Sequence, residues 1–316
     1  MKKKIGFIIS FCIILTCMAI MLPAHAKYTK GIYTYEVYNG NATITDCSSP
    51  SGEITIPSEL GGYPVTSIGY RAFEDCTLLT GVIIPEGVTI IYEYAFSNCT
   101  SLTNVKIPGS VTSICDDAFS NCESLINVTI PEGVVSIGDK VFYYCSSLTN
   151  ITIPGSVTSI GYGAFGNCSS LTSVAIPEGV TSIGDGAFDN CSSLTSVTIP
   201  ESITSIGGIA FYNCSSLTSM IIPEGITSIG NSAFKKCTSL THISIPESVK
   251  SIGYNAFYNC NNLKIVNLTD VAAWYNIDFG DNYANPFTYA NELYLNGEPA
   301  TDLVIPASVK NIDNRL

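Results

Sequence analysis

A 23-residue repeat runs through most of this chain and constrains its fold more than any other feature. Nine of the 13 phenylalanines and nine of the 13 cysteines fall in single columns at that interval, and eight prolines do the same. The columns are Pro85, Pro108, Pro131, Pro154, Pro177, Pro200, Pro223 and Pro246; Phe73, Phe96, Phe119, Phe142, Phe165, Phe188, Phe211, Phe234 and Phe257; and Cys76, Cys99, Cys122, Cys145, Cys168, Cys191, Cys214, Cys237 and Cys260. A unit this short cannot bury its own apolar face, so neighbouring units must stack and share one core.

The first half of each unit predicts a short strand. In the unit that spans residues 194–214, Val197 and Ile199 alternate with polar residues, which is typical of a half-buried strand. Pro200 ends that strand because proline has no N–H to donate to a ladder. With strands about 4.8 Å apart, ten stacked units would span roughly 50 Å.

The second half of the unit predicts a shorter apolar step followed by a turn. Ile203 and Ile206 form the step, and Gly207 permits the chain to turn because glycine tolerates conformations closed to other residues. We expect Ala210 and Phe211 to enter the core on one helical or 3₁₀ turn. Stacking then aligns the leucine, valine, isoleucine, phenylalanine and cysteine columns inside the coil.

The pattern Leu-x-x-Val-x-Ile-Pro-x-x-Val-x-x-Ile-Gly-x-x-Ala-Phe-x-x-Cys resembles the leucine-rich repeats of BspA-like surface proteins of host-associated bacteria and some protist parasites. The resemblance covers about residues 54–268 and returns at 301–313. It implies a leucine-rich-repeat solenoid, a β-rich, α/β-type right-handed superhelix with a parallel strand ladder. It also implies a secreted or cell-surface interaction scaffold that adheres to host matrix proteins or other cells. Departures from the pattern are local, such as Val141 in place of alanine and Cys115 in place of glycine.

The segments before and after the repeat array predict a signal peptide and additional structural elements at the two ends. Basic residues at Lys2–Lys4, an apolar run and the small residues of Ala24-His25-Ala26 predict a cleaved signal peptide, so the mature chain begins at Lys27. We expect a fragment of a longer protein, because terminal repeats need polar caps. The predicted parts are a signal peptide (1–26), an N-terminal β-hairpin cap (27–53), the repeat array (54–268), a helix-plus-hairpin insertion (269–300) and a resumed, incomplete repeat (301–316).

Charge and histidine content exclude several classes of function. The chain has 14 Lys+Arg against 26 Asp+Glu, a net charge of −12, which argues against nucleic acid or an anionic membrane as a partner. We expect no membrane insertion once the signal peptide has been cleaved. His25 leaves with the signal peptide, so His242 is the only imidazole of the mature chain, and mechanisms that need a histidine pair are excluded.

The cysteine column has chemical interpretations besides core packing. Zinc needs four convergent ligands from close spacings, and the chain has no Cys-x-x-Cys. Nine thiols in a row with parallel Cβ vectors cannot all pair as disulfides. We therefore expect free, buried thiols that pack as small hydrophobes, with Cys47 and Cys115 as odd thiols, and no metal or cofactor. Calcium at the glutamates that follow the prolines, such as Glu178 and Glu201, is a weaker alternative.

Two surfaces compete as the contact site for an extracellular protein or glycan ligand. The outward face of the strands is hydroxyl-rich, nearly uncharged and without an aromatic anchor. An outer rim near the phenylalanine column carries tyrosines, which are frequent in binding hot spots. The strand-face candidates are Thr149, Asn150, Thr152, Thr195, Ser196, Thr198, His242 and Ser244, and the rim candidates are Tyr143, Tyr162, Tyr212, Tyr254 and Tyr258.

The sequence predicts a monomeric interaction scaffold without catalytic residues. A catalytic triad requires three convergent groups, and the repeat places no acid beside His242. Two alternative functions stay open. The first alternative is a structural spacer that presents another domain. The second is a hydrolase that uses residues 270–300, with Asp278 and Asp281 as the acids to test.

Overall fold

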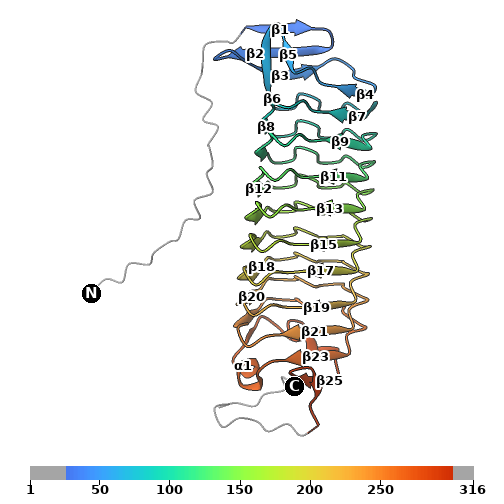
Figure 1. Cartoon of the computed structure of the whole chain (residues 1–316). Helices are drawn as coiled ribbons and strands as arrows, with labels where there is room; N and C mark the ends of the chain where they lie inside the picture. Colours follow the sequence, from blue (N-terminus) through green and yellow to red (C-terminus); the bar gives the residue numbers. More distant parts are fainter. Residues whose placement is uncertain (1–25, 302–316) are drawn as a thin grey trace, which may run out of the picture.

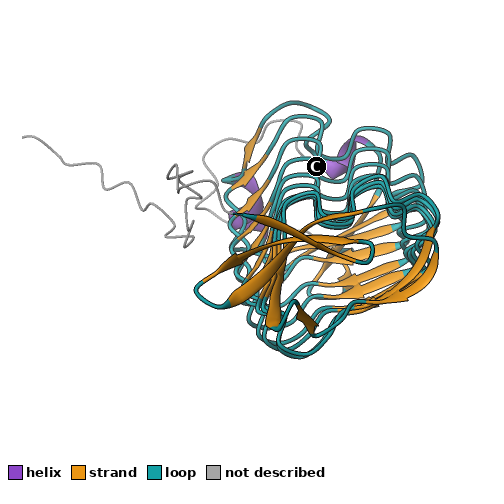
Figure 2. Cartoon of the chain, turned by 90° about the horizontal axis from the view of Figure 1, so that it is seen from above, coloured by secondary structure: helices purple, strands orange, loops and turns teal. Residues whose placement is uncertain are grey.

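The structure, a computed structural model, describes residues 26–301. The predicted signal peptide and the resumed repeat lie outside the described residues, apart from Ala26 and Thr301. The described chain is a solenoid of stacked coils (Figure 1), and a view along its axis shows strands on two sides of each coil with turns between them (Figure 2). Two parallel ladders result, which confirms the leucine-rich-repeat solenoid that the repeat predicts.

Each coil contributes one strand to each ladder. The first strand of a coil belongs to the ladder that we call the long-strand ladder, on the right of Figure 1, and the second to the short-strand ladder, on the left. The long-strand ladder comprises β4 (Gly52–Thr55), β7 (Leu79–Ile83), β9 (Asn104–Lys106), β11 (Asn127–Thr129), β13 (Asn150–Thr152), β15 (Ser173–Ala175), β17 (Ser196–Thr198), β19 (Ser219–Ile221), β21 (His242–Ile245), β23 (Ile265–Leu268) and β25 (Glu292–Leu295). The short-strand ladder comprises β6 (Tyr63–Ile68), β8 (Ile90–Ile91), β10 (Ser113–Ile114), β12 (Ser136–Ile137), β14 (Ser159–Ile160), β16 (Ser182–Ile183), β18 (Ser205–Ile206), β20 (Ser228–Ile229), β22 (Ser251–Ile252) and β24 (Asp278–Phe279).

The apolar columns form one continuous core. Every ring of the phenylalanine column is fully buried and stacks on its neighbours, with centroids 4.8–5.7 Å apart. The Sγ of each column cysteine from Cys99 to Cys260 donates to the main-chain oxygen of the phenylalanine 26 residues earlier, at 3.1–3.3 Å. The thiols are therefore hydrogen-bonded between coils as well as packed, which the sequence did not predict.

The segment that carries the phenylalanine has the i→i+3 bonds of single 3₁₀-type turns, but these turns do not extend into a helix. Each turn is closed by one main-chain hydrogen bond, for example from Tyr212 N to Ile209 O or from Cys214 N to Phe211 O. Ile209 and Asn213 have φ of 48° and 56°, and such left-handed residues interrupt a right-handed helix. The second of these positions holds asparagine in most coils because asparagine tolerates this conformation. The asparagines concerned are Asn98, Asn121, Asn167, Asn190, Asn213 and Asn259.

Three hydroxyl columns tie each coil to the coil before it. In each column the side-chain oxygen donates to the main-chain oxygen 23 residues earlier, at distances between 2.9 and 3.4 Å. These protons are therefore used inside the solenoid, and the polar ladders of the sequence have a structural role. The columns comprise Thr103, Thr149, Thr172, Thr195 and Thr241; Thr89, Thr112, Thr158, Thr181 and Thr227; and Ser146, Ser169, Ser192, Ser215 and Thr238.

Successive coils alternate between serine and glycine at the second residue after the column proline. Ser202 donates from Oγ to the main-chain oxygen of Val180 at 2.6 Å, whereas Gly225, one coil later, lies so close to the preceding coil that a Cβ would sit 2.8 Å from the oxygen of Ile203. In the middle of the long-strand ladder the strand pairing is interrupted, since β15 pairs with β17 and β19 with β21, but β17 and β19 belong to separate sheets, whereas the strands from β4 to β13 form one continuous sheet. The alternating residues are Ser110, Ser156, Ser202 and Ser248, and Gly87, Gly133, Gly179 and Gly225.

Additional elements cover both ends of the core. At the N-terminal end, the antiparallel strands β1 (Lys27–Lys30), β2 (Tyr33–Tyr38) and β3 (Asn41–Cys47) adjoin β6, which also pairs with β5 (Glu59–Leu60). Tyr33 packs edge-on against Phe73, the first ring of the stack.

The C-terminal end is closed by an aromatic cluster in a longer coil. Trp274, 1% exposed, contacts Phe279 and Phe287. The coil holds α1 (Val271–Tyr275) and η1 (Pro286–Thr288), and β26 (Glu298–Pro299) pairs antiparallel with β25. Ser251 pairs with Asp278, 27 residues later, so this coil is four residues longer than the repeat. In residues 26–301, no helix is long and apolar enough to cross a membrane.

Candidate functional site

The predicted strand-face residues all lie along the long-strand ladder, but in separate coils. Thr149, Asn150 and Thr152 lie at β13; Thr195, Ser196 and Thr198 at β17; and His242 and Ser244 in β21. The hydroxyls of Thr149 and Thr195 donate to the oxygens of Ile126 and Thr172, so their protons are not available to a ligand. Of this set, His242 and Ser244 line a hollowed part of the surface.

The predicted rim tyrosines form lysine-centred clusters. Lys140 Nζ lies 5.7 Å from the ring centroid of Tyr143 and 5.5 Å from that of Tyr162. Exposed cation–π contacts of this kind stabilise a fold by about 0.5–1 kcal/mol and cover one face of the ring. The structure likewise places Lys236 over Tyr212 and Lys235 over Tyr258. Tyr254 is outside these clusters, is 59% exposed and lines a groove on the short-strand ladder.

A groove of about 430 Å³ opens on the long-strand ladder across β19, β21, β23 and β25. We call it the strand-face groove. Strand register arranges its outward side chains in two columns, Ile221, Ser244, Asn267 and Tyr294, and Ser219, His242 and Ile265. Ile221 is 75% exposed, and Tyr294 ends the same column. The groove therefore has an apolar group at each end of that column and polar groups between them.

The polar middle of the groove is held by hydrogen bonds. Asn267 donates from Nδ2 to Ser244 Oγ at 3.1 Å and accepts at Oδ1 from the main-chain N–H of Gly297 at 2.8 Å. Both bonds fix the amide, so the floor of the groove is preorganised. The Ser244 hydroxyl accepts from Asn267 and keeps its own proton for a ligand.

His242 presents one ring nitrogen outward. Its Nδ1 lies 2.7 Å from Thr241 Oγ1, while that hydroxyl also lies 2.9 Å from the oxygen of Thr218. One hydroxyl proton cannot serve both contacts, so both form together only when Thr241 donates to Thr218 and His242 donates from Nδ1. Nε2 is then the acceptor that a neutral imidazole offers at the exposed edge.

Sequence reasoning missed Ile221, Asn267 and Tyr294, and the expectation of a face without an aromatic anchor was wrong at this end of the ladder. A signal for Ile221 exists, since the positions aligned with it in the neighbouring coils are polar or small, as in Ala175, Thr198 and Ser244. Tyr294 had no such signal, because the register that places it opposite Asn267 depends on the length of the last coil.

Two acids of the hydrolase hypothesis have structural partners. Asp270 caps α1 by accepting from the N–H of Ala273, and Asp281 accepts from the N–H groups of Ala284 and Asn255 at 2.8 and 3.1 Å. Among residues 26–301, no group of three or more His, Cys, Asp or Glu side chains is arranged to hold a metal ion.

The thiols are kept in their protonated form by burial. All 11 cysteines of the described part of the chain are free. Desolvation raises the pKa of Cys145 to about 12 and holds that of Cys214 well above its ordinary value. The thiolate is the reactive species, so these buried thiols are inert toward metals and oxidants in the native state.

Parallel ladders, a shared apolar core and a groove on the strand face define a leucine-rich-repeat solenoid, a class of scaffold that generally mediates protein interaction. The profile described as BspA type leucine rich repeat region, present in six copies, matches residues 66–193 and 158–283. This chain belongs to the BspA-type leucine-rich-repeat family, whose members are typically cell-surface proteins.

Solved structures support the family assignment. A leucine-rich repeat protein from Bacteroides ovatus is 32% identical, with a TM-score of 0.60 over 76% of this chain and 70% of the other. The T. pallidum leucine rich repeat protein is 31% identical, with a TM-score of 0.56 over 61% of this chain and 91% of the other. The pneumococcal vaccine antigen PcpA shares the fold at 21% identity, with a TM-score of 0.60 over 86% of this chain and 82% of the other. No curated protein sequence matches this chain.

Proposed function

We propose that this chain is a secreted or cell-surface scaffold that binds a protein partner through the strand-face groove. The observation that carries the proposal is Ile221, an isoleucine 75% exposed at a strand position that the neighbouring coils fill with Thr198 and Ser244. A large exposed apolar side chain beside a preorganised polar floor is typical of a contact site rather than of a solvated strand. Tyr294 at the far end of the column supplies an aromatic anchor of the kind that is frequent in binding hot spots.

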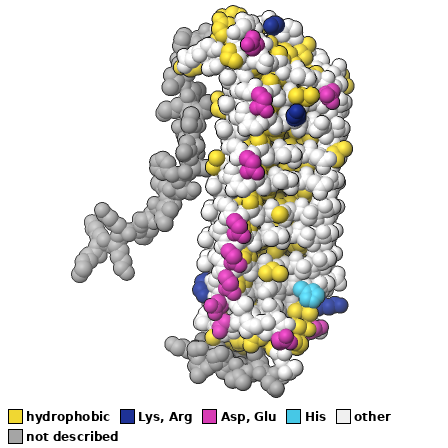
Figure 3. Space-filling view, in the orientation of Figure 1, with side chains coloured by type: hydrophobic (Ala, Val, Ile, Leu, Met, Phe, Trp, Pro, Cys, Tyr) yellow, Lys and Arg dark blue, Asp and Glu magenta, His cyan; other side chains and the backbone are white. Residues whose placement is uncertain are grey.

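The charge around the groove favours a basic partner. Glu224 and Glu247 follow β19 and β21, two strands of the groove, and both are exposed. Together with Glu178 and Glu201 they continue an acidic row over successive coils, which is visible in Figure 3. The groove itself is lined by no lysine or arginine among the described residues. A segment with apolar side chains flanked by lysine or arginine fits this surface, and the acidic row would accelerate its association at low salt.

Adhesion to host matrix proteins or other cells is the biological role that we infer from the family. The signal peptide predicted at residues 1–26 supports export, with the mature chain beginning at Lys27. A monomer without catalytic residues is sufficient for this role. A spacer that presents another domain would not need an exposed Ile221, so the groove favours adhesion over the spacer.

Binding to immobilised extracellular matrix proteins, measured by biolayer interferometry with residues 27–316, tests the proposal. We expect Ile221→Thr to weaken binding by about tenfold, because threonine keeps the strand but removes the apolar contact. Val135→Thr is the matched control, since Val135 is 54% exposed on a distant coil and its neighbours in the column are threonines. Equal loss in both variants, or no binding to any matrix protein, would contradict the proposal and favour the spacer.

A further inference from the structure

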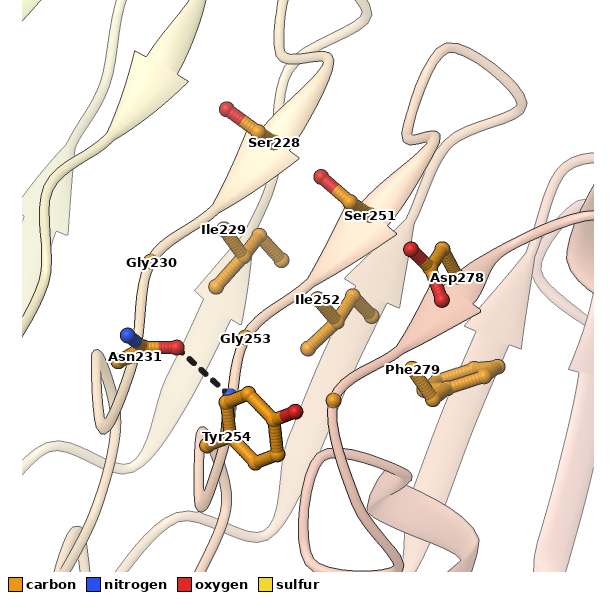
Figure 4. A pocket seen from close by; sticks show the side chains of 11 residues that line it. Ser228, Ile229, Gly230, Asn231, Ser251, Ile252, Gly253, Tyr254, Asp278 and Phe279 are labelled. Atoms are coloured by element: carbon orange, nitrogen blue, oxygen red, sulfur yellow. Dashed lines mark hydrogen bonds between the residues drawn. The ribbon is translucent and has the colours of Figure 1, made fainter.

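A second groove lies on the short-strand ladder, on a different part of the surface from the strand-face groove. Its volume is about 410 Å³, and β20, β22 and β24 form its floor. We call it the short-strand groove; Figure 4 shows Ser228, Ser251 and Asp278 on one side of it, and Asn231 and Tyr254 on the other. No residue of the strand-face groove contributes to it.

The floor of this groove is bare main chain. Gly230, Gly253 and Gly280 follow the three strands, and a Cβ on Gly253 would lie 2.6 Å from the main-chain nitrogen of Asn231. The side chains of Ile229 and Ile252 point into the core and are 2% and 1% exposed. The glycines therefore let neighbouring coils approach closely, and they add no side chain to the floor between the two polar walls.

The serine column of the short-strand ladder, to which Ser228 and Ser251 belong, differs from the hydroxyl columns that join the coils. Strand register aligns Ser228 with Ser251 and Ser251 with Asp278, about 4.8 Å apart in a ladder of this kind. Within the described residues, the side-chain oxygens of these three residues make no hydrogen bond inside the protein, whereas the neighbouring column at Thr227 donates to the preceding coil. The row thus offers two hydroxyls and one carboxylate to a ligand.

The opposite wall adds an amide donor and an aromatic face. Asn231 accepts at Oδ1 from the N–H of Tyr254 at 2.8 Å, which fixes the amide and leaves Nδ2 as a donor (Figure 4). Tyr254 is 59% exposed, and its ring makes none of the lysine contacts that cover Tyr162, its counterpart four coils earlier.

We propose that the short-strand groove binds a neutral oligosaccharide, with Tyr254 stacked on one sugar ring and the Ser228–Ser251–Asp278 row bonded to its hydroxyls. A pyranose has an apolar C–H face for an aromatic ring and hydroxyls that both donate and accept, which matches this mixture of groups. The lining contains no lysine, arginine or histidine, so a sulfated or phosphorylated ligand would meet Asp278 without a compensating cation. A single carboxylate cannot supply the acid and base of a glycosidase, so the site binds without hydrolysis.

The spacing of the row indicates how the ligand lies. One polar side chain per coil, repeated at about 4.8 Å, is comparable with the length of one sugar ring. The oligosaccharide therefore runs along the solenoid axis, across the strands, with successive rings over successive coils.

Isothermal titration of residues 27–316 with cellohexaose, chitohexaose and a sulfated heparin hexasaccharide tests this inference. We expect at least one of the two neutral probes to bind and the sulfated probe to bind more weakly or not at all. Tyr254→Ala should lower the affinity by about tenfold through loss of stacking, and Asp278→Asn should lower it severalfold. Tyr162→Ala is the matched control, because it removes a tyrosine at the same repeat position outside the groove.

Three outcomes would overturn the inference. These are an absence of heat with both neutral probes, tighter binding of the sulfated probe, and equal effects of Tyr254→Ala and Tyr162→Ala. Thermal melts of each variant establish that the fold is retained, since all three side chains lie at the surface. The strand-face variant Ile221→Thr should leave oligosaccharide binding unchanged, so failure of this proposal is distinguishable from failure of the protein-binding proposal.

Discussion

The Sγ of Cys214 donates a hydrogen bond to the main-chain oxygen of Phe188 at 3.2 Å, so a thiol proton joins two coils of the solenoid. The same bond recurs between coils from Cys99 to Cys260. Burial raises the pKa of these thiols, because a thiolate in the core would lose its hydration. Folding is therefore coupled to the protonation of the cysteine column.

We predict that the chain loses stability steeply as the pH rises above about 8.5, the ordinary pKa of a thiol in an unfolded chain. Above that pH the unfolded chain releases thiol protons that the native chain keeps, so each such thiol lowers the free energy of unfolding by about 1.4 kcal/mol per pH unit. The loss continues toward the native pKa, about 12 for Cys145. Denaturant midpoints measured between about pH 7 and 10 under reducing conditions test this, and Cys214→Ala should flatten the slope. An identical slope in that variant would refute the coupling.

The close approach of successive coils predicts opposite effects at two glycines. Gly225→Ala should destabilise the fold by about 2–4 kcal/mol, because its Cβ would meet the main-chain oxygens of Glu201 and Ile203. Gly155→Ala is the control, since no atom lies within 4 Å of its Cβ position and its φ is not positive. That variant should be neutral or stabilising by up to about 1 kcal/mol. Chemical denaturation measures both, and equal effects would show that the coils are not packed this closely.

The core could be predicted from the sequence because its residues follow the period, whereas the two grooves could not. Phe188 and Cys191 are placed by counting alone, since every coil repeats them. Asp278 and Tyr294 pair with residues 27 positions earlier, Ser251 and Asn267, so counting by 23 assigns other residues to their places. The four additional residues accommodate α1, whose packing against the end of the core is a tertiary effect.

The hydroxyl columns show a second limit of sequence reasoning. Thr149 and Ser228 are both small hydroxyl residues at regular positions, and the sequence does not distinguish them. The structure does, because Thr149 reaches the main-chain oxygen of Ile126 while Ser228 projects into a groove. Which hydroxyls remain for a ligand depends on the direction of each side chain. That direction is determined by where each strand begins and ends and by the geometry of the neighbouring coil.

Ile209 carries backbone strain that a substitution should relieve. Its φ of 48° is unfavourable for a β-branched residue, and the equivalent position is Gly186 one coil earlier and Asn255 two coils later. We predict that Ile209→Asn raises the free energy of unfolding by about 1 kcal/mol, because asparagine tolerates a positive φ better than a β-branched residue. Ile203→Asn is the opposite control, since Ile203 is fully buried and should not tolerate a polar side chain. A lower thermal midpoint for Ile209→Asn would show that packing outweighs strain at this position.

The break between β17 and β19 also predicts uneven local stability along the long-strand ladder. The N–H of Thr218 lies 3.5 Å from the oxygen of Thr195, across the break between β17 and β19, whereas the N–H of Thr241 lies 2.9 Å from the oxygen of Thr218. A longer, weaker bond opens more readily, so the Thr218 amide should exchange its hydrogen faster than the Thr241 amide. Native-state hydrogen exchange followed by NMR measures both rates. Equal protection would mean that the breaks in the ladder do not mark local weakness.

Asp278 and Asp281 differ in role: we propose that Asp278 binds a ligand, whereas Asp281 is structural. Asp281 joins two coils by accepting from the N–H groups of Ala284 and Asn255, so Asp281→Ala should cost about 1–2 kcal/mol of stability. Asp278 is exposed, and within the described residues its carboxylate accepts no hydrogen bond from the protein, so Asp278→Ala should change stability by less than about 0.5 kcal/mol. Urea denaturation of the two variants measures these values side by side. A large loss for Asp278→Ala would mean that this acid holds the last coil in place, and the carboxylate would then no longer be available to the oligosaccharide.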